Sequence, residues 1–428
     1  MDIFRSARFR RLFKESFWIV LGQAAAVIGA LAVVRLLTEL LDPAAYGELA
    51  LGMAMATLVN QTVLGPLGNG VNRFYAPAQE KGDLGGYLNA VRRLVLNATS
   101  VVVLMTIFAI GGLLVSGRKE WIVIVVMAII FATLSGYNSI LSGIQNAARQ
   151  RAVVALHQGV EYWARFLVAA ALLSWLGATS TVAMLAYAVA LMLVLGSQYV
   201  FFRKIVPKNV TGPHTEERWR EQMLKYSWPF ASWGIFCWAQ SASDRLSLEL
   251  CTTTREVGLY AVLFQLGYQP VSMATGMAMQ LLAPIMYQQA GDASDSRRNA
   301  NVNKLIWRLA WLSLSVTGVA FLFALLFHTQ IFWFCVAKEY AYISYLLPWV
   351  VLAGGVFAGG QVIALNLMSQ MKTHTMVVAK IATAIFGVIF NFAGAYLFGI
   401  AGIVFAGVLF SVLYSAWMVM LSKRAAVG

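Results

Sequence analysis

The chain has 428 residues, of which 60% are hydrophobic and 12% are charged, and its mean hydropathy is +0.71. Soluble domains usually carry about twice that fraction of charged residues. Long apolar segments recur from one end of the chain to the other, and each bilayer span needs about 20 apolar residues. The composition therefore excludes a soluble body with a single anchor. It predicts an all-α polytopic membrane protein with about twelve transmembrane helices.

The net charge of +14 could suggest a nucleic-acid partner, but the positions of the charges argue against one. Basic residues occur in short clusters between apolar segments, as the positive-inside rule describes. Most of the 32 lysine and arginine residues fall on the side of the two termini. We therefore expect both termini in the cytoplasm, membrane lipids around the helices and no nucleic-acid partner.

The apolar segments predict spans in chain order at residues 15–37, 45–74, 92–116, 121–146, 152–176, 178–202, 223–249, 256–288, 304–327, 344–369, 374–398 and 400–421. Two pairs of spans almost touch, at Gly177 and at Gly399. The short glycine-containing segments there predict tight hairpins.

The longest polar segment lies in the middle of the chain and divides the spans six and six. It predicts an N-terminal six-helix bundle at 1–202, a cytoplasmic linker at 203–222 and a C-terminal six-helix bundle at 223–428. The halves also look alike in sequence, which would make the bundles parallel repeats, the arrangement typical of alternating-access transporters. Chance similarity among hydrophobic helices is the alternative.

Two short motifs carry this likeness between the halves. Leu41-Asp-Pro-Ala-Ala-Tyr-Gly47 introduces the long second span, and Arg255-Glu-Val-Gly-Leu-Tyr260 introduces the long eighth span, after Asp244-Arg245 in the seventh. These motifs resemble the polysaccharide-transport family of Wzx-type flippases for O-antigen and other lipid-linked oligosaccharides. That family shares a superfamily with the MATE exporters and the MurJ-type lipid II flippases.

The resemblance implies a MATE-like, V-shaped fold of two pseudo-symmetric bundles in the bacterial inner membrane. It also implies a cationic central cavity that accepts a pyrophosphate-linked glycan while the polyprenyl tail stays in lipid. The expected partners are the lipid-linked oligosaccharide and polysaccharide assembly proteins. MurJ-type flippases have two further C-terminal helices that this sequence lacks, so a cargo other than lipid II is expected.

The second span carries a polar stripe whose spacing places its members on one helix face. The stripe consists of Gln61, Gly65, Asn69 and Arg73, with Asn72 beside them. It predicts a bent helix that lines a water-filled path, with Arg73 meeting the pyrophosphate near the cytoplasmic mouth. The alternative for Arg73 is snorkelling to the lipid headgroups.

Ionisable residues at membrane depth are costly, so they usually face a cavity or a partner. In the fifth span, His157, Glu161 and Arg165 share one helix face. Arg165 would contact the pyrophosphate or an acidic sugar, and Glu161 would be a protonatable coupling site. Alternatively, Glu161 and Arg165 form a pair that only neutralises itself between helices.

In the seventh span Asp244 is the second candidate for cation coupling. Its alternative role is a local ion pair with Arg245 that fixes the end of the helix. Gln265 and Gln269 in the eighth span precede a helix-breaking proline and predict a second polar stripe along the substrate cavity. Asn391 in the eleventh span would extend this lining.

The sequence contains no Walker-type nucleotide loop, no HExxH motif and no paired-cysteine metal site, so we expect no catalytic residue, cofactor or metal. The predicted function is a flippase that moves a polyprenyl-pyrophosphate-linked oligosaccharide by alternating access. A MATE-like antiporter of cations or drugs is one alternative, although the in-span charges lean basic. A membrane-embedded polysaccharide polymerase or glycosyltransferase is another, but such enzymes need sizeable extramembrane loops.

Overall fold

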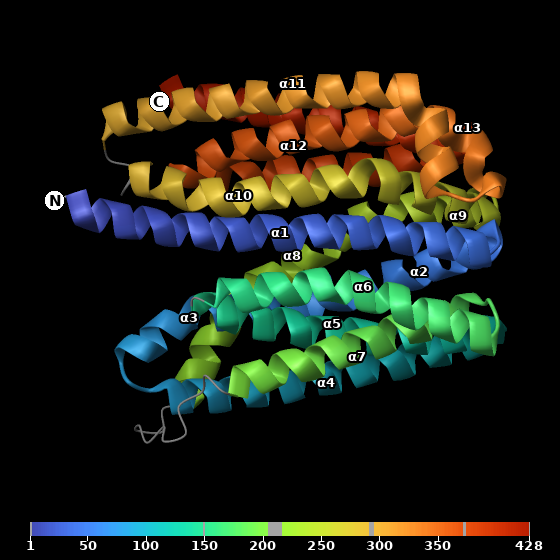
Figure 1. The fold of residues 1–428 in the computed structure, drawn as a ribbon, viewed down its shortest axis with the longest axis horizontal. Coiled ribbons are helices and arrows are strands. Elements are labelled where there is room, and N and C mark those ends of the chain that lie inside the picture. Colours follow the sequence, from blue (N-terminus) through green and yellow to red (C-terminus); the bar gives the residue numbers. More distant parts are fainter. Residues whose placement is uncertain (1, 149, 204–215, 291–294, 371–373, 428) are drawn as a thin grey trace. The chain divides into compact units, whose positions relative to one another are not determined.

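The computed structural model describes residues 2–148, 150–203, 216–290, 295–370 and 374–427, and the regular structure within these ranges is helical (Figure 1). Its α-helices are α1 (Asp2–Leu40), α2 (Pro43–Val59), α3 (Gly65–Glu80), α4 (Leu84–Val115), α5 (Ile122–Ala147), α6 (Arg151–Leu176), α7 (Ser180–Arg203), α8 (Glu216–Cys251), α9 (Thr254–Leu263), α10 (Gln269–Ala290), α11 (Ser296–Cys335), α12 (Leu347–Ser369) and α13 (His374–Val427). Short 3₁₀ helices at Lys119–Trp121 and Lys338–Leu346 precede α5 and α12. Two π-helical turns, Asn60–Leu64 and Phe264–Tyr268, join α2 to α3 and α9 to α10.

Among the described residues, eight helical segments are long and apolar enough to cross a membrane, so the prediction of an all-α, multi-pass membrane protein is confirmed. The helices α6, α8 and α9–α10 are not among the eight. They and the π-turn between α9 and α10 carry Glu161, Arg165, Asp244, Gln265 and Gln269, polar residues that lower the mean hydropathy. The segment of α13 is counted once although it contains two predicted spans. The total of twelve therefore stays a prediction.

Both predicted glycine hairpins are confirmed. The helix α6 ends at Leu176, the next residue, Gly177, has a φ of +102°, and α7 begins at Ser180. The helix α13 turns at Gly399, where φ is +58° and ψ is −133°, a conformation that residues with a side chain rarely adopt. The helical segments before and after this turn pack closely against each other. A Cβ on Gly394, before the turn, would overlap the carbonyl of Gly402, after it.

The chain folds as two compact units. Unit 1 comprises Met1–Leu41 and Leu51–Trp238, and unit 2 comprises Asp42–Ala50 and Ala239–Gly428. Most of the predicted linker, residues 204–215, lies outside the described residues. From Glu216 onward the predicted linker is helical and forms the start of α8.

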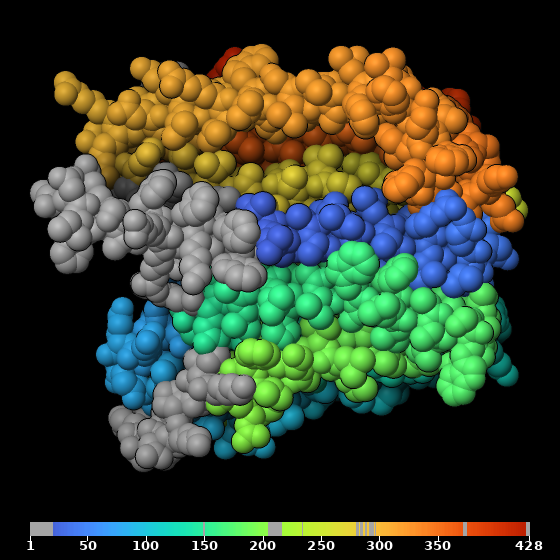
Figure 2. All heavy atoms as spheres, viewed as in Figure 1, coloured from blue at the N-terminus to red at the C-terminus, as the bar shows by residue number. Residues whose placement is uncertain are grey.

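In unit 1, small residues let α1 and α6 pack closely. A Cβ on Gly22 would overlap the carbonyl of Ala155, and one on Gly29 would crowd Tyr162. Figure 2 shows the coloured part of α1 lying against α6. On the other side of the unit, the buried Gln198 of α7 donates hydrogen bonds to Ser142 Oγ (2.8 Å) and Gln145 Oε1 (2.7 Å) on α5. These bonds pair the Gln198 amide nitrogen and the Gln145 amide oxygen, atoms that would be costly to bury unpaired.

The start of α8 is anchored to the short turn between α3 and α4. Trp219 is 2% exposed, and its Nε1 donates to Asp83 Oδ2 at 2.8 Å. The rings of Phe74 and Tyr87 pack edge-on against it. Asp83 also accepts from the backbone N–H of Gly86 and so caps α4. This cap places the start of α4 eight residues before the predicted apolar span.

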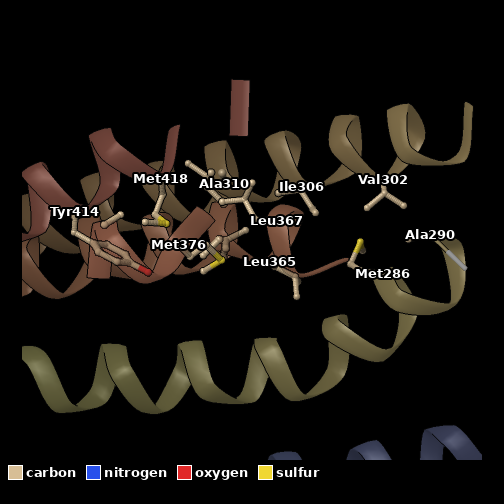
Figure 3. Close-up of a cluster of buried hydrophobic side chains, with 14 residues drawn as sticks. Met286, Ala290, Val302, Ile306, Ala310, Leu365, Leu367, Met376, Tyr414 and Met418 are labelled. Carbon is tan, nitrogen blue, oxygen red and sulfur yellow. The ribbon is translucent and has the colours of Figure 1, made fainter. Parts of the chain in front are cut away.

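In unit 2, side chains from four helices form a buried cluster (Figure 3). It contains Met286 and Ala290 of α10, Val302, Ile306 and Ala310 of α11, Leu365 and Leu367 of α12, and Met376, Tyr414 and Met418 of α13. The three α11 residues recur every four positions, the spacing of one helix face. Near this cluster, the fully buried Asn366 of α12 donates to Asn303 Oδ1 (2.9 Å) and Ser422 Oγ (2.8 Å).

The motifs that begin the second and eighth spans meet in unit 2. A Cβ on Gly47 would overlap the carbonyl of Thr254, and a Cβ on Gly258 would overlap that of Pro43. The starts of α2 and α9 therefore pack backbone against backbone. Nearby, Tyr46 packs edge-on against Tyr340, and both are fully buried.

Candidate functional site

The polar stripe of the second span lies on the π-turn and on α3 in unit 1. Gln61 is the second residue of the turn Asn60–Leu64, and its buried Oε1 has no hydrogen-bond partner among the described residues. Asn69, Asn72 and Arg73 lie on α3 and are exposed. The helix continues to Glu80, beyond the predicted end of the span, so Arg73 lies about two turns before the helix end.

Two neighbours fix the orientation of α3. A Cβ on Gly70 would crowd Ser227 of α8, so this face of α3 packs against α8. The amide of Asn72 lies directly against Gly143 of α5. Asn69 and Arg73 are four residues apart and therefore project from one face of α3. Within the described part of the chain, no acidic side chain forms an ion pair with Arg73.

Arg165 has a different environment, also in unit 1. It forms an ion pair with Glu161 one turn earlier, and the two side chains are 12% and 15% exposed. The rings of Phe131, Tyr162 and Tyr187 surround the guanidinium carbon at 5.1, 5.2 and 5.2 Å. Aromatic rings at these distances stabilise a cation.

The amide of Asn138 on α5 donates to Glu161 Oε2 at 3.4 Å, which adds a third polar group to the pair. Arg165 Nε is buried without a hydrogen-bond partner among the described residues. On the same helix, His157 is buried, with Nδ1 2.8 Å from the Val153 carbonyl and Nε2 3.2 Å from Ser197 Oγ. Of the three residues that the sequence places on one face of α6, Glu161 and Arg165 contact each other. His157 instead has partners on its own helix and on α7.

Unit 2 contains a cavity of about 140 Å³ between α8, α9, α12, α13 and the second π-turn. Its lining is mixed polar and aromatic: Gln240, Ser241, Asp244, Tyr260, Phe264, Tyr268 and Asn391, with Ser411 and small apolar residues. Asp244 is 7% exposed, and its Oδ2 accepts a hydrogen bond from the Tyr260 hydroxyl at 2.8 Å. A buried carboxylate beside polar oxygens is the type of group that binds a proton or a small cation in membrane proteins.

Arg245 occupies the other side of the Asp244 carboxylate. Its Nη1 lies 3.3 Å from Asp244 Oδ1, and its guanidinium lies 4.7 Å from the centre of the Phe264 ring. Asn391 donates to Ser243 Oγ at 2.7 Å, which fixes the amide beside the cavity. The structure thus contains both arrangements considered for Asp244, a local pair with Arg245 and a place in a polar cavity.

The two glutamines of the eighth span belong to the same unit but not to this cavity. Gln265 is the second residue of the π-turn Phe264–Tyr268, and Gln269 is the first residue of α10. Neither is among the described residues that line the cavity around Asp244. Both side chains are partly buried.

Tyr260 and Tyr268 are cavity residues that the sequence reasoning did not select. Buried tyrosines in a membrane protein resemble interface or core residues in sequence, so only the fold reveals their position. The sequence signals near them are the motif that contains Gly258 and Tyr260 and the two glutamines, Gln265 and Gln269, on either side of Tyr268. Within the described ranges, no group of three or more His, Cys, Asp or Glu side chains could hold a metal ion.

Comparisons with known proteins bear on both the family and the fold. The sequence pattern of the family described as "Polysaccharide biosynthesis protein" matches residues 12–290. No curated protein matches the chain in sequence.

Two groups of solved structures share the fold. An inward-facing multidrug resistance MATE family transporter of the MOP superfamily is similar over 96% of this chain and 94% of its own, with 12% identity and a TM-score of 0.64. The lipid II flippase MurJ in an inward closed conformation is similar over 96% of this chain and 87% of its own, with 12% identity and a TM-score of 0.66. At these identities the likeness concerns the fold alone, and it confirms the prediction of a MATE-like architecture.

Proposed function

The chain belongs to the polysaccharide biosynthesis protein family, as the sequence resemblance predicted, and on that premise we propose that it is a flippase for a lipid-linked oligosaccharide. The cargo would be a polyprenyl-pyrophosphate-linked O-antigen or exopolysaccharide repeat unit. It would cross the bacterial inner membrane by alternating access, with both termini in the cytoplasm. The observation that carries the proposal is the match of this family over residues 12–290 of a chain with the fold of MATE and MurJ proteins.

The exposed face of α3 supplies the anion contact in this proposal. Arg73 is exposed and has no acidic partner among the described residues, so its guanidinium can bind a phosphate oxygen. Asn69 lies one turn before it, and Asn72 lies beside it, so two amides accompany the charge. Arg165, in contrast, already has Glu161 as its partner. We therefore assign the principal pyrophosphate contact to Arg73 and a secondary one to Arg165.

Gln61, Gln265 and Gln269 complete the proposed cavity lining, since amides can donate to sugar hydroxyls and accept from them. Asp244 in its polar cavity and Glu161 beside Arg165 are the proposed ion-coupling residues. The lipid tail would stay among membrane lipids, and polysaccharide assembly proteins would receive the exported unit.

The test is a deletion strain analysed for lipid-linked glycans on the two faces of the inner membrane. We expect the glycan to accumulate on the cytoplasmic face and to return to the outer face when the wild-type chain is restored. Arg73→Ala should restore much less export at an equal protein level, whereas Arg73→Lys should retain part of it because the charge remains. Normal export by Arg73→Ala would overturn the assignment of this residue.

A second candidate function, antiport of an organic cation by a MATE-like mechanism, is favoured by the buried Asp244 in its cavity. The two functions differ in the deletion strain. A cation exporter would change susceptibility to cationic drugs without accumulation of lipid-linked glycan.

A further inference from the structure

The two long helical segments α2–α3 and α9–α10 each contain a π-helical turn, at equivalent points. In unit 1 the turn is Asn60–Leu64, and in unit 2 it is Phe264–Tyr268. In each case the N–H of the next residue, Gly65 or Gln269, donates to the carbonyl of the first residue of the turn, five positions earlier. A π-turn of this kind is an α-helix that holds one additional residue.

The same residue types occupy the same places in both turns. A glutamine, Gln61 or Gln265, is the second residue of the turn. A proline, Pro66 or Pro270, is the second residue after the turn. The distance from glutamine to proline is therefore five positions in both halves. This shared spacing argues that the two turns are one feature of the repeat and not two accidents of packing.

The proline explains why the turn forms there. A proline ring clashes with the carbonyl four residues earlier in an α-helix, and it has no N–H to donate. In the π register, the carbonyl that faces the proline nitrogen belongs to the glutamine, so Gln61 and Gln265 each face a nitrogen without a hydrogen. One main-chain hydrogen bond of the helix, the one to the glutamine carbonyl, is thus missing at the same point in each half. A helix bends most easily where such a bond is missing.

In unit 2 the turn separates a tightly packed segment from a thinly packed one. Every residue of Val257–Leu263 is buried. From Gln269 to Met279, in contrast, no residue is fully buried. The turn itself is held at Gly267, where a Cβ would crowd Val350 of α12. The first part of α10 can therefore shift while Val257–Leu263 stays packed, whereas Met286 and Ala290 further along α10 belong to the buried core.

In unit 1 the equivalent turn is braced by α8. The backbone of Gly234 approaches the Gln61 carbonyl so closely that a Cβ would overlap the oxygen. Gly70 of α3 lies in a similar way against Met223. The glycine at 234 therefore lets a neighbouring backbone cover the carbonyl that the proline leaves without a donor.

We propose that the two π-turns are the paired hinges of the transport cycle. At these hinges, α3 changes direction relative to α2 and α10 changes direction relative to α9. The inference goes beyond the proposed function because it requires only that the chain alternates between conformations, whatever it carries. Hinges of this kind absorb backbone changes at a few residues while the packed elements on either side stay rigid.

The direct test measures distances across the hinge of unit 2 by pulsed electron paramagnetic resonance in lipid nanodiscs. Nitroxides are attached at Arg255→Cys and Ala274→Cys, both exposed, after the three native cysteines are replaced by serine. The wild-type helix should give a broad or two-peaked distribution. Deletion of Leu266 combined with Pro270→Ala removes the additional residue and the proline. It should give one narrow peak at about 27 Å, the length of an uninterrupted helix over the remaining 18 residues.

A matched control uses the same separation on a helix without a π-turn. Leu96→Cys and Val115→Cys lie on α4, both exposed, and should give one narrow peak in every variant. A single narrow peak across the hinge in the wild-type protein, as narrow as that of the α4 control, would overturn the proposal. This measurement does not depend on whether the straightened variant folds.

Export provides the second readout. The deletions of Thr62 with Pro66→Ala and of Leu266 with Pro270→Ala keep the register of all later residues, so normal protein levels are expected. Transport should fall about tenfold or more in each. Full transport by both straightened variants would overturn the hinge proposal. A wrong assignment of the cargo would give a different pattern of results. The wild-type hinge would still show a broad distance distribution, but the strain that lacks this protein would accumulate no lipid-linked glycan.

Discussion

Replacement of Arg165 by alanine decides between the two roles considered for this residue. The guanidinium is 12% exposed, pairs with Glu161 and lies among three aromatic rings. After the substitution, the Glu161 carboxylate would remain largely buried, with the amide of Asn138 at 3.4 Å as its remaining donor among the described residues. Breaking a buried pair from one side leaves an uncompensated charge, which costs about 3–5 kcal/mol.

The loss of the ring contacts adds to this cost, since each cation–aromatic contact contributes about 0.5–2 kcal/mol. The double substitution Glu161→Gln and Arg165→Met removes both charges together and retains most of the side-chain volume. Replacement of a buried pair by uncharged groups is often close to neutral for stability. The double variant should therefore be more stable than Arg165→Ala, although it lacks the same cation.

The assay is the midpoint of thermal unfolding in mild detergent, measured together with glycan export at matched protein levels. If Arg165 is mainly structural, Arg165→Ala unfolds well below the wild type, and the double variant recovers both stability and export. If Arg165 contacts the cargo or Glu161 couples an ion, the double variant recovers stability and remains inactive. An unchanged unfolding midpoint for Arg165→Ala would refute the reasoning about the buried pair.

Three further substitutions test single contacts. Tyr260→Phe removes the hydroxyl that donates to Asp244, so it should cost about 1–3 kcal/mol and change the dependence of transport on pH or sodium. Gly399→Ala places a side chain at φ +58° and should destabilise the α13 hairpin by about 1–3 kcal/mol, seen as a lower unfolding temperature. Trp219→Phe keeps the ring packing but loses the hydrogen bond to Asp83, which should cost about 1–3 kcal/mol and expose the start of α8 to proteolysis.

Each of these variants has a matched control, the same type of substitution at a residue that is exposed or has no neighbouring atom near its Cβ. Tyr396→Phe and Trp228→Phe change residues that are 79% and 72% exposed, and Gly111→Ala adds a Cβ that meets no atom within 4 Å. The controls should unfold at the wild-type temperature. Equal behaviour of a test variant and its control would show that the contact in question contributes nothing measurable.

The sequence predicts the helical membrane fold because apolar length and basic clusters are local signals. It also predicts the turns at Gly177 and Gly399, since a glycine between two apolar segments of spanning length favours a reversal of the chain. The start of α4 at Leu84 escapes prediction. Polar residues there extend the helix beyond the apolar segment, and the cap by Asp83 that begins it depends on a turn that periodicity does not reveal.

The candidate site is predictable in part for a similar reason. A charge at membrane depth stands out in sequence, so Arg73, Arg165 and Asp244 are recognisable as candidates. Their surroundings come from residues far along the chain, such as Tyr187 beside Arg165 and Tyr260 beside Asp244. Helical periodicity gives the face on which a residue lies, but it does not identify the helix that covers that face.

The matching π-turns also bear on the history of the chain. If the two halves descend from one duplicated six-helix ancestor, the glutamine, the proline five positions later and the additional helical residue were already present before duplication. An insertion of one residue in a packed helix is normally removed by selection unless it serves a purpose. On that premise, its survival in both copies, although most neighbouring residues differ, would date this irregularity to a time before the two halves acquired separate roles.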